Sequence, residues 1–437
     1  MFRYYLELAL RSLRRSPGLT VLMVLAIGFG VAASMTTWSV FRAVSGDPIP
    51  WKSSRLFVPQ IDIWKPTGKN HDLNNAFDYT DAVALMRDHR GKLQSAMYQI
   101  APSVMPTDVA RHPINVTGEA VFGEFFRMVD APFKYGSGWS TQDDANRARV
   151  VVLSDKLSQQ VFGDVDSVGR TVNIKGEEYR VAGVLGHWNP QPRYYDVVSS
   201  GGFVADGGED VFLPFNTAID VGMSNGGPIN CNETPKGSGF VGLQQSSCVW
   251  ISYMVELDSA AEVASYRNYL DGYLREQQQA GRFNWPPRYK LSNLPTWLNA
   301  QGVVPDDTKV SLLVALGLLI VCLVNTAGLL LAKFLRRSGE IGVRRALGAP
   351  RSAIYAQFLT EAGMIGAAGG VVGLLFTGIG VACVGWVLPS DIARLARLDV
   401  SLLGMTLLVA VVATVLAGLY PTWRASRVQP AWQIKSN

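Results

Sequence analysis

The stretch LTVLMVLAIGFGVAASMTTWSVFRAV, residues 19–44, is apolar over the length that a helix needs to cross a membrane. About 20 mostly apolar residues span the hydrocarbon core of a bilayer. Three further stretches meet this condition, so the sequence predicts transmembrane helices over residues 18–44, 309–335, 353–388 and 401–421. The first stretch is too long for the apolar part of a signal peptide, and no convincing small-residue cleavage site follows it, so we expect it to remain as an anchor.

The composition agrees with a membrane protein. Of the 437 residues, 48% are hydrophobic and only 17% are charged, which is a low share for a chain whose whole surface is hydrated. The net charge of +5 comes from basic residues that gather at the ends of the apolar stretches. Because these residues form no separate basic stripe, we do not expect nucleic acid as a partner.

The basic residues also predict the orientation, because cytoplasmic flanks of membrane spans retain Lys and Arg. They precede the first span, fill the connection between the second and third, and follow the fourth. They are Arg3, Arg11, Arg14, Arg15, Lys333, Arg336, Arg337, Arg344, Arg345, Arg351, Arg424, Arg427 and Lys435. The connection over 389–400 is the least basic, since Asp391 and Asp399 offset Arg394 and Arg397. We therefore expect a multi-pass protein of the bacterial inner membrane, with both termini and the tail 422–437 in the cytoplasm and residues 45–308 in the periplasm.

Residues 1–17 have apolar side chains at Phe2, Leu6, Leu10 and Leu13, with arginines between them. This spacing predicts an amphipathic helix that lies on the cytoplasmic membrane surface and contacts lipid.

Between the first two spans, residues 45–308 predict a mixed α/β domain. Residues 149–153 indicate a strand, Ser154 the N-cap of a helix, and residues 171–174 and 179–184 a hairpin, which together suggest a small sandwich-like unit. Residues 187–248 are rich in Gly, Ser, Asn and Pro and suggest surface loops or an insertion within a domain of two subdomains. The fold class is thus an α+β membrane protein with four transmembrane helices and a large extracytoplasmic α/β domain between helices 1 and 2.

Four cysteines fall into two kinds. Cys322 and Cys383 lie in apolar stretches, where small buried side chains are expected. Cys231 and Cys248 bracket the polar stretch CNETPKGSGFVGLQQSSC. A disulfide is possible there in an oxidising compartment, but spacing alone leaves open whether the two residues are bridged.

The sequence contains little that predicts chemistry. It has no Walker-type phosphate loop, no HExxH, no CxxC and no G-x-S-x-G, and its four histidines lack metal-ligand spacing. His71 beside Asp72 is better explained as a solvated surface pair. No charged residue lies in the middle of a span, which argues against an ion pathway. We expect no catalytic residue, no metal site and no cofactor in this chain, which cannot hydrolyse ATP alone.

The most informative segment is RRSGEIGVRRALGAPRSAIYAQFLTEA, residues 336–362. Its periodicity predicts a short amphipathic helix over 340–347 that Gly348, Ala349 and Pro350 terminate. Arginines alone would suffice to anchor such a helix to anionic lipid. The Gly-Glu-Ile-Gly sequence before the arginines and the small-residue stop after them are more than lipid binding requires.

This segment resembles the signature of the FtsX-like permease family, in which a coupling helix between the second and third spans docks into a separate ATPase. The stretches RSPGLTVLMVLAIGFGVAASMT, ARVVVLSDKLSQQVFGD, GEEYRVAGVL and AGLYPTWRASRVQPAWQIK agree with the MacB-like branch in the same order. The resemblance implies a coupling helix over 336–352 and a separate ABC ATPase dimer that holds ATP and Mg²⁺, since no fused ATPase precedes the first span. The implied coupling residues are Glu340, Ile341, Arg344, Arg345, Leu347, Gly348 and Ala349.

The resemblance also implies a dimer with a second copy or a paralogous permease, in contact along the first two spans. Gly28, Gly30 and Ala33 give the first span small residues that let helices approach closely, although such residues also occur on lipid-facing helices. Asn325 is costly in hydrocarbon unless it is hydrogen-bonded, so we expect it at a helix contact.

The implied function is efflux from the periplasm through an adaptor protein and an outer-membrane channel, driven by motion that the spans transmit. The family also includes transmitters that activate a periplasmic cell-wall enzyme and permeases that extract lipoproteins. A membrane-anchored receptor without any ATPase would leave the coupling segment unexplained.

Overall fold

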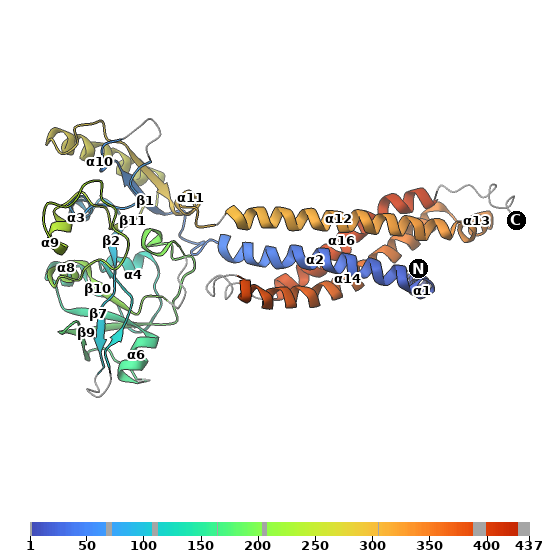
Figure 1. The fold of residues 1–437 in the computed structure, drawn as a ribbon, viewed down its shortest axis with the longest axis horizontal. Coiled ribbons are helices and arrows are strands. Elements are labelled where there is room, and N and C mark those ends of the chain that lie inside the picture. Colours follow the sequence, from blue (N-terminus) through green and yellow to red (C-terminus); the bar gives the residue numbers. More distant parts are fainter. Residues whose placement is uncertain are drawn as a thin grey trace. The chain divides into compact units, whose positions relative to one another are not determined.

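The computed structural model describes residues 2–66, 72–106, 112–163, 165–202, 208–304, 306–387 and 399–426. The chain divides into two compact units (Figure 1). We call Asp47–Val303 the core domain, and Met1–Gly46 together with Val304–Asn437 the membrane unit. The predicted fold class is confirmed: the described residues include four helices long and apolar enough to cross a membrane, with a large α/β domain between the first and second.

The membrane unit is a bundle of helices. Its elements are α1 (Phe2–Arg15), α2 (Pro17–Ser45), α12 (Asp306–Arg336), α13 (Ser338–Ala346), α14 (Arg351–Val387) and α16 (Val400–Ser426). The four candidate spans are α2, α12, α14 and α16. Helix α14 packs against both α2 and α16, and α12 packs against α2 and α16. All four spans contribute to one apolar cluster, which includes Ile27, Phe334, Phe358 and Ala410.

One sheet runs through the core domain in the order β12-β1-β11-β2-β5-β10-β7-β9-β8-β3-β4, and β6 pairs with β9. The strands are β1 (Leu56–Ile61), β2 (Leu93–Ile100), β3 (Ser103–Met105), β4 (Ile114–Asn115), β5 (Gly118–Val121), β6 (Phe133–Gly136), β7 (Val150–Ser154), β8 (Thr171–Ile174), β9 (Glu177–Leu185), β10 (Val211–Pro214), β11 (Ser252–Glu256) and β12 (Tyr289–Asn293). The pairs β5–β10 and β7–β9 are parallel, whereas the neighbouring pair β10–β7 is antiparallel.

Both faces of this sheet are covered. The helices of the domain are α3 (Tyr79–Asp88), α4 (Glu124–Met128), α5 (Thr141–Ala145), α6 (Asp155–Phe162), α7 (Val197–Ser200), α8 (Phe215–Asp220), α9 (Gly239–Gln244), α10 (Ala260–Gln279) and α11 (Leu294–Ala300). Successive side chains of a strand point to opposite faces. Tyr98 of β2 accordingly packs in one apolar cluster with Phe215 and Trp250, and Met97 packs in the other with Phe125.

The predicted strand, helix and hairpin are confirmed. The hydroxyl oxygen of Ser154 accepts a hydrogen bond from the backbone N–H of Leu157 at 3.1 Å and caps α6, which follows β7 directly. Strands β8 and β9 form the hairpin, with positive φ angles of 53° at Lys175 and 89° at Gly176. A two-residue turn of this kind matches the twist of its flanking strands. These elements belong to the continuous sheet rather than to a separate sandwich-like unit.

The expectation of an insertion over 187–248 is wrong for residues 211–214. This segment is β10, which pairs with β5 on one side and β7 on the other and so joins the two halves of the sheet. Residues 211–214 are therefore part of the sheet, and the expected division of the core domain into two subdomains stays a prediction. Only four residues, VFLP, carry the strand signal, and the Gly- and Asp-rich sequence before them is typical of a loop.

Candidate functional site

Helix α13 is a short segment between α12 and α14. It runs from Ser338 to Ala346, and Gly348 follows with a φ of +94°, a backbone conformation that favours glycine and ends the helix. Ile341 is only 5% exposed and belongs to the apolar cluster that contains Ile354 and Phe358 of α14. The inner face of α13 is therefore fixed by apolar packing.

Arg344 and Arg345, two of the predicted coupling residues, have partners within the chain. One guanidinium nitrogen of Arg344 donates to Oε1 of Gln357 at 2.9 Å, and another donates to Oε1 of Glu340 at 2.8 Å. Arg345 donates to the backbone oxygen of Ser426 at 3.3 Å. These arginines therefore hold α13 against α14 and α16 in addition to carrying charge.

The outward surface of α13 is apolar at its C-terminal end. Leu347 is 83% exposed, and Val343, one helical turn before it, is 61% exposed. Gly348 is exposed as well and Ala349 is half-buried. Sequence reasoning identified Leu347, Gly348 and Ala349 but missed Val343, although its i, i+4 spacing from Leu347 places both on one face. Val343 and Leu347 thus form a small exposed apolar surface at this end of α13.

Sequence reasoning also missed Glu361 of α14, a fully buried residue that contacts three other segments of the membrane unit. Ser12 donates its hydroxyl to Oε1 of Glu361 at 2.6 Å, and Nζ of Lys333 lies 2.5 Å from the same oxygen. A guanidinium nitrogen of Arg337 lies 3.3 Å from Oε2. One signal in the sequence points to this residue, because Glu361 is the one acidic residue in the predicted third span and a carboxylate there is costly without partners.

The residues predicted for dimer contact fall into two groups. Gly28 and Gly30 are buried within the chain: a Cβ atom on Gly28 would come within 2.9 Å of Val372, and one on Gly30 within 3.0 Å of Cys322. Asn325 is exposed and Ala33 is half-buried. The assignment of Gly28 and Gly30 to a contact between subunits is therefore corrected, because α14 and α12 of the same chain occupy the space beside them. For Ala33 and Asn325 it stays a prediction.

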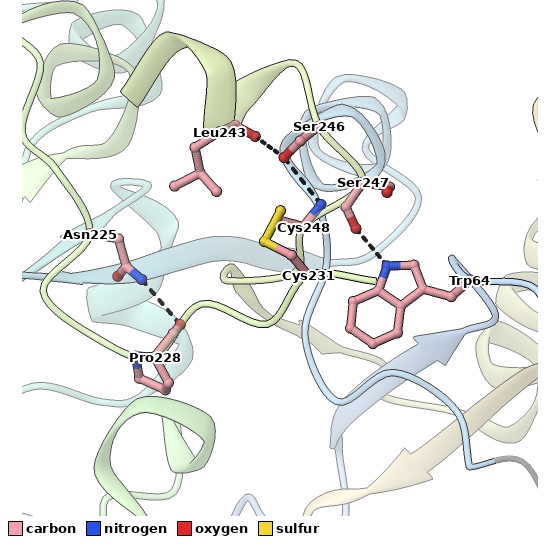
Figure 2. The surroundings of a disulfide bond; sticks show 8 residues. All are labelled: Trp64, Asn225, Pro228, Cys231, Leu243, Ser246, Ser247 and Cys248. Carbon is pink, nitrogen blue, oxygen red and sulfur yellow. Dashed lines mark hydrogen bonds between the residues drawn. A yellow bond between two sulfur atoms is a disulfide. The ribbon is translucent and has the colours of Figure 1, made fainter. Parts of the chain in front are cut away.

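A disulfide joins Cys231 and Cys248, the pair whose bridging the sequence left open (Figure 2). It closes the segment that carries α9, and Cys248 is almost fully buried. The indole nitrogen of Trp64 donates to the backbone oxygen of Ser247 at 2.7 Å, beside the bridge. The hydroxyl of Ser246 donates to the backbone oxygen of Leu243 at 2.7 Å. The loop is thus held covalently and by local hydrogen bonds.

The core domain also contains a buried cluster of ionisable groups. Arg193 lies 2.7 Å from Oε1 of Glu209, and Tyr195 donates its hydroxyl to Oε2 of the same carboxylate. Glu119 and Asp196 lie in the same cluster, and all five residues are nearly inaccessible to solvent. Burial raises the pKa of Glu119 well above its usual range, and the charges of Asp196 and Glu209 raise it further. Since one guanidinium cannot neutralise three carboxylates, the cluster favours the protonated form of Glu119.

Some predicted features lie outside the described residues. These are His71, the greater part of the connection expected over 389–400, and residues 427–437 at the end of the expected tail.

Two family profiles match the chain. Residues 20–273 match the MacB-like periplasmic core domain, and residues 312–430 match the FtsX-like permease C-terminal region. The first match covers more than half of the chain.

The chain is also similar to curated proteins. It is 24% identical to the macrolide export ATP-binding/permease protein MacB of Syntrophobacter fumaroxidans, over 98% of this chain and 63% of that protein. It is 25% identical to the pyoverdine export ATP-binding/permease protein PvdT of Pseudomonas syringae pv. syringae, over 70% of this chain and 40% of that protein. The chain thus spans less than two thirds of the length of these relatives. Among solved structures, the periplasmic region of MacB from Actinobacillus actinomycetemcomitans matches with a TM-score of 0.36 and 13% identity, over 59% of this chain and 96% of that chain.

The four apolar helices and these family matches indicate a multi-pass protein of the inner membrane. The match to the MacB-like periplasmic core domain covers most of the mixed α/β domain between the first two spans. The chain therefore belongs to the MacB-like, FtsX-like family of ABC transporter permeases.

Proposed function

We propose that this chain is the permease subunit of an ABC exporter and transmits the nucleotide cycle of an ATPase through α13 and the spans to the core domain. One observation carries the proposal. On the outer face of α13 Val343 and Leu347 are exposed, while its inner face is fixed to α14 by Ile341 and Arg344. A partner that binds the exposed apolar residues Val343 and Leu347, which we call the apolar tip of α13, could therefore displace α13 together with α14.

In this proposal the ATPase is a separate ABC subunit that acts as a dimer and binds ATP and Mg²⁺. The similarity to proteins described as ATP-binding/permease proteins supports an ATPase as the functional partner of the permease. Two copies of the permease, or one copy and a paralogue, then meet along the spans, where Asn325 and Ala33 have accessible surface.

We further propose that both termini lie in the cytoplasm and that the core domain lies in the periplasm. The basic flanks of the spans support this orientation. The two relatives described above are named for export of a macrolide and of pyoverdine. By analogy, this chain would drive efflux of a periplasmic substrate with an adaptor protein and an outer-membrane channel.

The experiment places a photo-crosslinking amino acid at position 347 of the full-length chain in its native membrane. We expect an ABC ATPase in the crosslinked product, identified by mass spectrometry. The matched control carries the same amino acid at Val241 of the core domain, which is as exposed as Val343. Equal crosslinking of an ATPase from positions 241 and 347 would overturn the proposal. So would the absence of an ATPase from both crosslinked products.

A further inference from the structure

The carboxylate of Glu361 binds groups from three other segments of the membrane unit. Its Oε1 atom accepts the hydroxyl of Ser12 from α1 and pairs with Lys333 from α12. Its Oε2 atom pairs with Arg337, the residue between α12 and α13. A single side chain of α14 therefore meets α1, α12 and the start of α13.

The ion pairs continue along α13. Arg337 lies 3.2 Å from Oε2 of Glu340, which also pairs with Arg344 at 2.8 Å through its other oxygen. Arg344 then donates to Gln357 at 2.9 Å. Gln357 and Glu361 are four residues apart and lie on one face of α14. Helix α13 is thus tied to that face at its start, through Glu361, and near its end, through Gln357.

Stability alone does not account for this arrangement. Glu361 is fully buried and the side chain of Lys333 is 4% exposed, so both groups have lost their hydration. Apolar residues of similar volume are often as stable as a buried ion pair. The contact between α12 and α14 is already made by the rings of Phe334 and Phe358, whose centroids are 4.1 Å apart. Glu361 instead fixes the relative orientation of these helices. An ion pair with several hydrogen bonds allows one geometry, whereas apolar packing allows several.

We propose that Glu361 is the positioning residue of the coupling helix: it holds α13 in one orientation relative to α12 and α14, so that a displacement of α13 moves both spans together. This inference rests on the proposed function for the source of the displacement. The positioning role itself concerns only residues of the membrane unit.

Two variants separate positioning from folding. Lys333→Met removes one cation and leaves Glu361 with Ser12 and Arg337. The double variant Lys333→Met/Glu361→Met also removes the carboxylate. Lys333 is then absent, so it is not left without its partner, and Arg337 still forms its ion pair with Glu340. A comparison of the single with the double variant therefore isolates the loss of Glu361, without the penalty of an uncompensated buried charge.

The readout is the distance between spin labels in the full-length chain in lipid nanodiscs, with Cys322 and Cys383 replaced by alanine. One pair of labels is placed at the exposed residues Ala346 of α13 and Ala368 of α14, and a control pair at Ala368 and Leu416 of α16. We expect a single narrow distance peak for both pairs in Lys333→Met, and loss of that peak only for the α13 pair in the double variant.

An α13 peak that stays narrow in the double variant would overturn the proposal. So would broadening of the control pair, because Glu361 would then be a general packing residue of the bundle. No ATPase is present in this measurement, whereas crosslinking from position 347 tests the partner. A broadened α13 peak together with no ATPase crosslink would leave the positioning role standing and remove the proposed function.

Discussion

Gly28 of α2 lies so close to Val372 of α14 that a Cβ atom added to the glycine would come within 2.9 Å of Cγ1 of the valine. The carbonyl oxygen of Gly369 would lie 3.2 Å from this added Cβ atom. Helices in a membrane associate through close packing more than through the hydrophobic effect. The small residues at this point of α2 therefore serve the fold of one chain.

Gly28→Ala should destabilise the membrane unit by about 1–3 kcal/mol, because the added methyl group overpacks the contact with α14. The melting temperature of the purified chain in detergent measures the effect. Gly404 of α16 has no atom within 4 Å of its added Cβ, so Gly404→Ala is the matched control and should melt like the wild type. Equal melting temperatures for the two variants would contradict the observed packing.

Asn325→Leu should weaken self-association of the chain in lipid by about 0.6–2 kcal/mol, because an exposed amide in a span gains most from a hydrogen bond across a helix contact. Energy transfer between labelled copies in vesicles measures the dimer fraction. Val324→Leu, next to it and also exposed, keeps the surface apolar and should change little. A dimer fraction that does not respond to Asn325→Leu would remove this residue from the interface.

Leu347→Asp should weaken binding of the ATPase by about 2 kcal/mol, roughly thirtyfold in affinity, because it places a charge on the apolar tip of α13. The melting temperature of the isolated chain should not change, since the leucine is 83% exposed. Charge reversal at Arg344 should reduce stimulation of the ATPase and also lower the melting temperature, because it breaks contacts with Gln357 and Glu340. Unchanged binding in Leu347→Asp would remove the tip from the interface.

Replacing Cys231 and Cys248 by serine should destabilise the core domain by roughly 3 kcal/mol, the loop-closure entropy expected for a loop of this size. The two residues are 17 positions apart in the sequence. Thermal unfolding of the full chain, with and without reductant, measures the effect. Reductant should lower the melting temperature of the wild type and leave the serine variant unchanged. The same response in both would show that the bridge does not form in the cell.

Glu119→Gln should flatten the dependence of stability on pH. In the folded chain the pKa of Glu119 is raised well above its ordinary value of 4.5, mainly by burial, so the folded state holds a proton that the unfolded state releases. The protonated Glu119 contributes fully to the free energy of unfolding below about pH 4.5. This contribution is lost as the pH rises, by up to about 1.4 kcal/mol per pH unit. Gln cannot release this proton.

Melting temperatures between pH 5 and pH 8 test this prediction, with the difference between variant and wild type as the measured quantity. Groups that do not interact with Glu119 drop out of that difference, including Asp144, whose pKa burial raises to about 7. The wild type should lose stability relative to the variant as the pH rises. Parallel curves would mean that Glu119 is ionised in the folded chain.

The sequence by itself determined the spans, the domain between the first two and the local units of that domain. A span depends on the summed transfer free energy of about 20 neighbouring residues, and no distant contact changes that sum. The cap at Ser154 and the turn at Lys175 and Gly176 are equally local, because the groups that satisfy one another lie within a few residues.

Only the tertiary structure decided which of these pieces meet. The sequence of β10 is typical of a loop region, and only its pairing with β5 and β7 shows that it is a strand of the sheet. Ser12 and Glu361 are 349 positions apart, and no periodicity connects them, yet they share a buried hydrogen bond. The sequence suggested that Gly28 contacts a second subunit, whereas in the structure it packs against α14 of the same chain. Contacts between distant residues are set by how helices and strands pack, and packing depends on the whole chain at once.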